Sequence, residues 1–388
     1  MSRIMLCINQ NDIETPYKFS MTGIEVYSFE EALYHTYNYW KESLEDYLSN
    51  EFVDWVKNTL DQKYLATRIT ELRSISSQSE RLIKFLSLNE YYDGAALAAI
   101  KAEINVWEQQ LEWERLKDMG DIFMNKGEPQ KAHHYYKKAL ASGENIKLLN
   151  NMGVCLMEME LFDEAAGYLE KAYKLDKDNF NVLINYIESL IYKSDFEAAF
   201  KYLRKAERGG EKAVVSYLYG RLCQKSNNLN EALKHYEKAA SLEYDPFYYY
   251  MLAECYVKLR KYNKALETLE FIKEKDRDFY IFQAEIYAAF EDYSAAVKCM
   301  EKAVVFGDRK SPNLWAILAK YHRLNYNMER AERAALTALN MDKDNRLARL
   351  EMARIKKSQG KTRDYQKSLN TVLESFKKEY RDIVNTSE

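Results

Sequence analysis

The second two thirds of the chain repeat one hydrophobic pattern, and each copy predicts two helices joined by a short turn. In the clearest copy, residues 216–256, a first helical run holds a small residue, Gly220. A second run carries small, aromatic and small residues on one face, namely Ala232, Tyr236 and Ala239. Apolar residues spaced three and four apart lie on one side of a helix, so both runs are predicted to be amphipathic helices. The pattern starts again at Ala253.

The small position of the first helix recurs at steps of 33, 34, 33, 33, 31, 35 and 34 residues. Its copies are Gly120, Gly153, Ile187, Gly220, Ala253, Ala284, Ala319 and Ala353. A constant period in this range is typical of a solenoid, in which each repeat packs only on its neighbours. We expect the two helices of a pair to approach closely at the small positions, because Gly or Ala leaves room there for an opposing backbone.

The first 112 residues follow a different pattern. Two short runs read as strands, Ile4–Ile8 and Gly23–Tyr27, and could form a β-hairpin within residues 3–27. Ser28 followed by Glu31 is a capping box, which predicts a helix through about Leu48. Further helices are expected near 50–60, 63–73 and 79–88, and a single helix of about 30 residues is expected from Asp93 to the first repeat.

The repeated pattern resembles that of the tetratricopeptide repeat family. The resemblance implies an all-α fold, a right-handed superhelical α-solenoid of helix-turn-helix repeats, with a mostly helical N-terminal domain that contains a small strand element. We place the N-terminal domain at residues 1–112, about seven repeats at 113–345, and a capping helix pair and tail at 346–388. The N-terminal domain resembles no family that we can name.

Composition adds few constraints on the partner. The net charge of -3 gives no general case for nucleic acid or membrane partners, and no apolar run approaches the roughly 18 residues that span a membrane. The 5 cysteines are scattered and form no CxxC pair, which is typical of reduced thiols in a cytosolic protein. We therefore expect a cytoplasmic protein, and the sequence leaves its oligomeric state open.

Motifs of catalysis are missing from the sequence. It has no glycine-rich phosphate loop, no HExxH, no GxSxG and no Cys/His cluster at metal spacing. We expect no enzymatic activity, no cofactor and no metal.

The resemblance implies a concave groove lined by chosen positions of each first helix. The candidate partner-binding residues at these positions are Lys117, Asn151, Asn185, Tyr217, Arg221, Phe247, Tyr250, Met251, Ile281 and Phe282. The first half of this set is amide-rich and the second half is aromatic, a combination that would suit an extended or helical peptide with apolar anchors. The alternative is that some of the rings pack between adjacent helix pairs.

Three functions are compatible with such a groove. The leading hypothesis is a non-catalytic interaction scaffold that binds a protein or peptide, and the second is a peptide-responsive sensor that acts through a partner protein. The third is a co-chaperone: relatives that hold the C-terminal carboxylate of heat-shock chaperones carry Lys and Asn, then Asn, then Lys and Arg. The chain matches them at Lys117 and Asn151, but it has Asp121, Asn181 and Asn185 at the other positions.

Overall fold

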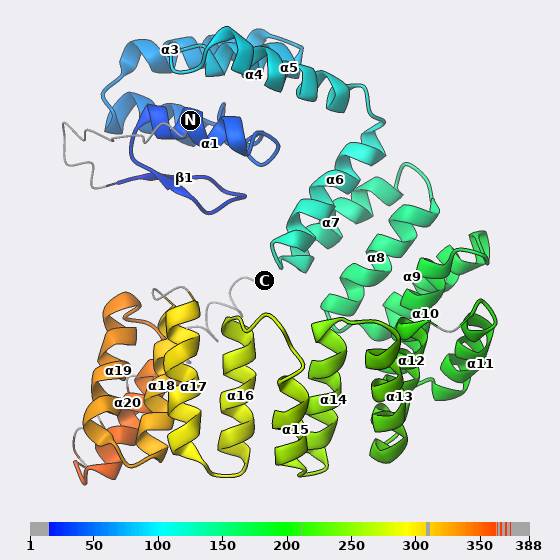
Figure 1. Cartoon of the computed structure of the whole chain (residues 1–388). Coiled ribbons are helices and arrows are strands. Elements are labelled where there is room, and N and C mark those ends of the chain that lie inside the picture. Colours follow the sequence, from blue (N-terminus) through cyan, green and yellow to red (C-terminus); the bar gives the residue numbers. More distant parts are fainter. Residues whose placement is uncertain are drawn as a thin grey trace. The chain divides into compact units, whose positions relative to one another are not determined.

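The computed structural model describes residues 15–210, 212–307 and 311–361, together with residues 363, 365, 366, 369, 370 and 373. The chain divides into two compact units, residues 1–189 and 190–388, which are described separately (Figure 1). The boundary falls inside helix α10, Phe180–Tyr192. The predicted fold class is confirmed, since the described residues form an all-α solenoid with one small strand element.

The first unit begins with a two-stranded antiparallel element, in which β1, Tyr17–Lys18, pairs with β2, Glu25–Val26. The predicted strand Ile4–Ile8 lies outside the described residues. Five α-helices, a π-helix and a 3₁₀-helix follow and enclose one apolar core. They are α1 Phe29–Asn38, α2 Asn50–Asp54, η1 Trp55–Thr59, α3 Lys63–Glu71, η2 Leu72–Ser74, α4 Gln78–Leu86 and α5 Gly94–Glu108.

Helix α1 begins as predicted and ends earlier. Ser28 caps it by accepting a hydrogen bond from the backbone N–H of Glu31 at 3.1 Å. The helix stops at Asn38 instead of continuing to about Leu48, and residues 39–48 form turns. The Ser43 hydroxyl donates to the Tyr39 carbonyl oxygen at 2.8 Å, and such local bonds compete with a continued helix.

The single helix predicted from Asp93 is in fact two helices, α5 and α6, Glu112–Asn125. Asp93 caps α5 as expected, through the Ala96 N–H at 2.8 Å. The break occurs at Leu111, whose backbone is extended and whose N–H donates to the Glu114 carboxylate at 3.0 Å. Glu114 thereby satisfies a donor that a continuous helix would have used, so α6 has its own N-terminus.

Contacts inside the first unit tie the strand element to the first repeat. Met21, in the turn between β1 and β2, packs in the same apolar cluster as Met119 and Phe123 of α6. The Lys126 ammonium donates to the Met21 carbonyl oxygen at 3.4 Å and pairs with the Glu42 carboxylate at 3.5 Å. The strand element therefore covers apolar side chains of the first repeat.

Helix pairs make up the rest of both units. The first unit holds α6, α7 Pro129–Leu140, α8 Ile146–Glu158 and α9 Phe162–Leu175. The second holds α11 Phe196–Glu207, α12 Ala213–Lys225, α13 Leu229–Leu242, α14 Pro246–Lys258, α15 Tyr262–Leu269, α16 Arg277–Ala289, α17 Tyr293–Phe306, α18 Pro312–Leu324, α19 Met328–Met341 and α20 Arg346–Ser358. From α12 on, successive helices of the second unit lie side by side (Figure 1). Most of the second predicted capping helix lies outside the described residues.

The small positions of the first helices are buried. What the glycines among them make room for differs from our expectation. A Cβ atom added to Gly220 would lie 2.5 Å from the ring of Tyr236, on the second helix of the same pair. Gly153 faces the Leu169 side chain in the same way. Glycine therefore makes room for a large side chain of the partner helix, and the prediction that it makes room for a backbone was wrong at these positions.

No helix among the described residues is both long enough and apolar enough to cross a membrane.

Candidate partner-binding surface

Asp121 on α6 is the centre of a polar cluster in the first unit. Its Oδ1 atom accepts hydrogen bonds from the Tyr136 hydroxyl at 2.6 Å and from Asn151 Nδ2 at 2.9 Å. Its Oδ2 atom accepts from the Lys117 ammonium at 2.6 Å. Charge-assisted bonds of this kind are stronger than bonds between neutral groups, so the carboxylate holds side chains from α6, α7 and α8 in place.

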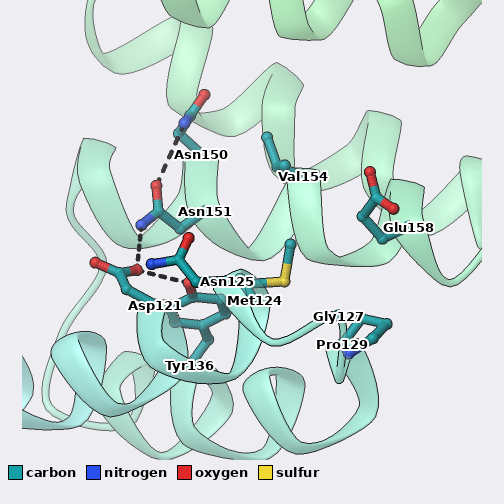
Figure 2. Close-up of a pocket in the computed structure, with 10 residues that line it drawn as sticks. All are labelled: Asp121, Met124, Asn125, Gly127, Pro129, Tyr136, Asn150, Asn151, Val154 and Glu158. Carbon is teal, nitrogen blue, oxygen red and sulfur yellow. Dashed lines mark hydrogen bonds between the residues drawn. The ribbon is translucent and has the colours of Figure 1, made fainter. Parts of the chain in front are cut away.

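A row of amides extends from this carboxylate across the first helices of three repeats. Asn150 Nδ2 donates to Asn151 Oδ1 at 3.4 Å, and Asn185 Nδ2 on α10 donates to Asn150 Oδ1 at 2.9 Å. Figure 2 shows Asp121, Asn151 and Asn150 joined in this order. We call Asp121, Asn151, Asn150 and Asn185 the polar ladder.

Beside the ladder, the first unit has an open pocket of about 780 Å³. Its walls come from α6, α7, α8 and the turn between α6 and α7 (Figure 2). The lining residues are Asp121, Met124, Asn125, Gly127, Pro129, Tyr136, Asn150, Asn151, Val154 and Glu158. They include two carboxylates and no Lys, Arg or His, so the pocket offers hydrogen-bonding groups, apolar walls and negative charge.

Lys117 does not offer the cation that the sequence predicted for the groove. Its ammonium lies 2.6 Å from the Asp121 carboxylate and 3.2 Å from that of Asp118. Burial opposes the charge of Lys117, but the bonds to Asp121 and Asp118 outweigh it, so its pKa is raised. A ligand carboxylate would have to compete with two carboxylates already in place, which weakens the case for a chaperone tail.

In the second unit, some of the predicted aromatic side chains are buried between repeats and others are exposed. Tyr217 on α12 is only 7% exposed, and its ring lies 5.0 Å from that of Phe247 on α14. Phe247 itself is 43% exposed. Tyr217 is therefore an inter-repeat packing residue, and Phe247 presents its ring at the surface.

Tyr250 on α14 and Phe282 on α16 contact each other edge to face, with 5.7 Å between ring centroids. Both rings are half-buried, as are the side chains of Met251 and Ile281 beside them. Burial raises the pKa of Tyr250 to about 12, with a smaller contribution from Asp276. The contact occupies the same positions in successive repeats as the Asn150–Asn185 bond, counted from the small residues.

Arg221 on α12 stacks on the Tyr192 ring, with its guanidinium carbon 5.0 Å from the ring centroid, and donates to the Tyr192 hydroxyl. The Lys225 ammonium lies 4.9 Å from the same ring. These contacts hold two cations at the start of the second unit, next to a neutral aromatic ring.

The structure thus brings the candidate residues together in two sets, one in each unit. Sequence reasoning placed Asp121 and Asn150 at groove positions but did not keep them among the partner-binding candidates, and it missed Glu158. The signal for Glu158 was its place four residues after Val154, which puts both on the same side of the helix. Among the described residues, no three His, Cys, Asp or Glu side chains are grouped so as to hold a metal ion.

Three segments of the chain match models of known protein families. Residues 117–180 and 248–270 match families described as Tetratricopeptide repeat. Residues 158–239 match the family described as Anaphase-promoting complex, cyclosome, subunit 3.

Individual relatives are distant. The chain is 24% identical over 251 residues to BBSome complex member BBS4 of Bos taurus, which covers 63% of this chain and 42% of that protein. It is 26% identical over 135 residues to the Tetratricopeptide repeat protein 21 homolog of Caenorhabditis elegans, covering 32% of this chain and 10% of that protein. The match therefore spans less than half the length of either relative.

Among solved structures, yeast Tom70 superposes on the chain with a TM-score of 0.51 and 15% sequence identity, covering 88% of each chain. At this identity the likeness concerns the fold alone. The matches at residues 117–180 and 248–270, together with the buried small positions of the helix pairs, show that this chain is a tetratricopeptide repeat protein.

Proposed function

We propose that the chain is a non-catalytic scaffold that binds an extended segment of a partner protein along the first helices of its repeats. The observation that carries the proposal is the polar ladder, a row of side-chain amides that begins next to the Asp121 carboxylate and ends at Asn185. A primary amide has two N–H groups and a carbonyl oxygen with two lone pairs. Each ladder amide thus retains hydrogen-bonding capacity after its ladder bonds are made, and a peptide backbone supplies matching groups.

The aromatic set supports the same function in the second unit. Phe247 is exposed, and the half-buried pair of Tyr250 and Phe282 offers ring edges and faces next to Met251. Aromatic rings and Met are enriched in the centres of protein interfaces, and the aromatic rings provide apolar contact area at low entropic cost. We propose that these side chains take apolar anchors of the partner.

Similarity to a BBSome complex member supports a place in an assembly of several proteins. The match covers 42% of that relative, so the partners of this chain are to be found by experiment. The chemistry of the ladder and of the aromatic set predicts a partner with an extended, partly apolar segment.

Affinity capture from the native cell tests the proposal. Wild-type protein is compared with the double variant Asn150→Ala/Asn185→Ala, and with Glu164→Gln as control, since Glu164 is exposed on α9 and does not line the pocket. Quantitative mass spectrometry should show a specific set of proteins that is lost with the double variant and kept with the control. An identical set with all three proteins, each shown to be folded, would overturn the proposal.

A further inference from the structure

The charged side chains that line the pocket beside the polar ladder are all negative. Its lining side chains include the carboxylates of Asp121 and Glu158 and no basic group. Figure 2 shows these two carboxylates toward opposite ends of the pocket, with Asn151 and Val154 between them.

The two carboxylates differ in what they already bind. Asp121 is engaged by Lys117, Tyr136 and Asn151, so its charge is largely used within the protein. Glu158 lies near the C-terminal end of α8 and is exposed, and no ion pair joins it to another residue in the part of the chain that the structure describes. The end of a helix carries a partial negative charge from its carbonyl groups, which adds to the charge of Glu158.

The wall between the carboxylates is partly apolar, because Met124, Pro129 and Val154 contribute to it. A Lys or Arg side chain has an aliphatic stem and a cationic head, so it packs its stem on apolar surface and places its head near an anion. The pocket offers both surfaces within one volume of about 780 Å³.

We infer that this pocket selects a basic side chain, Lys or Arg, from an extended segment of a partner protein, with Glu158 as the residue that recognises the cation. The inference rests on the proposed function, since the ladder would hold the backbone that carries this side chain. It makes the chain's preference opposite to that of a carboxylate-binding groove, because the cation of Lys117 is occupied and the accessible charge is negative.

The test is a selection of peptides from a random library displayed on phage, with the full-length chain immobilised. Selection on wild type should enrich Lys and Arg over the input library at one position of the bound peptides, by about tenfold for a gain near 1.4 kcal/mol. The variant Glu158→Lys should remove or reverse this enrichment. The matched control Glu164→Lys makes the same charge change on α9 and should keep it.

Two results would overturn the inference. One is that peptides selected on wild type show no enrichment of Lys or Arg. This includes selection of acidic or neutral peptides and selection of no peptide. The other is that Glu158→Lys keeps the enrichment, or that Glu164→Lys loses it equally, since a general attraction of basic peptides to the protein would then explain the result.

Failure of the proposed function gives a different pattern. In that case the selected peptides bind the Asn150→Ala/Asn185→Ala variant as tightly as wild type, whatever their charge. If binding falls in this variant while the peptides carry no basic preference, the ladder binds a partner segment and only the inference about Glu158 is overturned.

Discussion

Asn151 Nδ2 donates a hydrogen bond to Asp121 Oδ1 over 2.9 Å, and this contact joins the first helices of two successive repeats. A carboxylate can only accept, so Asn151 must turn its NH₂ group toward Asp121 and its oxygen away. That oxygen then accepts from Asn150, whose own oxygen accepts from Asn185. One carboxylate therefore sets the direction of every bond in the polar ladder.

Replacement of this carboxylate should weaken the first unit. In Asp121→Asn, the amide cannot accept at both Oδ1 and Oδ2 positions, so one of the donors from Lys117, Tyr136 or Asn151 loses its acceptor. Loss of a bond to a charged group costs about 1.5–3 kcal/mol. Urea unfolding followed by circular dichroism should show this loss, with Glu164→Gln as control. Equal stability of wild type and Asp121→Asn would contradict the central role of the carboxylate.

Gly220→Ala should destabilise the second unit. In an open helix this change stabilises by roughly 0.5–1 kcal/mol, because alanine loses less conformational freedom on folding. At position 220 the new methyl group would instead collide with the Tyr236 ring, and overpacking costs about 1–3 kcal/mol. Thermal unfolding measures the sign of the change.

The chain offers matched controls for this collision. Gly167 lies in α9 with nothing within 4 Å of an added Cβ atom, so Gly167→Ala should leave stability unchanged or raise it. The double variant Gly220→Ala/Tyr236→Leu copies Ala253 and Leu269, which occupy these positions in the next repeat and are both fully buried. It should regain part of the lost stability. A Gly220→Ala variant as stable as Gly167→Ala would show that the ring moves aside without cost.

Alanine substitution at Tyr250 and Phe282 separates recognition from packing. The rings contact each other, and such pairs contribute about 0.5–1.5 kcal/mol beyond their buried area, so a double-mutant cycle should show coupling of this size in stability. Because both rings are half-exposed, we expect partner affinity to fall as well. A large fall in Tm with unchanged affinity would mean that the pair only packs.

His35 should make the stability of the first unit depend on pH. Burial lowers its pKa to about 4, helped by the nearby Lys126 ammonium, and its ring nitrogens lie 2.7 Å and 3.1 Å from the hydroxyls of Thr22 and Ser43. The unfolded state takes up a proton near the ordinary pKa of 6.5 and the folded state does not. The contribution of neutral His35 to the free energy of unfolding is therefore fully present above pH 6.5. It decreases as the pH drops from 6.5 to about 4.

The His35→Asn variant checks this assignment. It lacks the titrating ring, so its stability should change less than that of wild type between pH 6.5 and 4 in urea unfolding. Parallel pH profiles for the two proteins would assign the acid sensitivity to other groups.

The period was enough to predict the solenoid, because each copy from Gly120 to Ala353 is a buried residue on the first helix of its pair. The period could not tell what each small residue faces. Gly220 faces Tyr236, sixteen residues away, and this pairing depends on how far the two helices approach. Likewise, the single helix expected from Asp93 is interrupted at Leu111, whose N–H bonds to the Glu114 side chain.

The sequence named candidate residues one by one, but it could not name the side chains that each of them contacts. Lys117 and Asn151 both donate hydrogen bonds to Asp121, which sequence reasoning treated as a mismatch. Tyr217 shows the opposite case, since a residue expected in the groove is buried against Phe247. Which neighbour a side chain meets across repeats depends on three-dimensional stacking, and repeat spacing alone does not contain it.

Site-specific photo-crosslinking tests the central claim most directly, because it reports where the partner lies on the folded chain. A photoreactive amino acid is placed at Val154, which lines the pocket beside the polar ladder, or at Gly167, which is exposed on α9 and lines no part of that pocket. In the native cell, the protein labelled at 154 should form a crosslink to a partner that the protein labelled at 167 does not form. Crosslinks from position 167 with none from position 154 would contradict binding along the first helices.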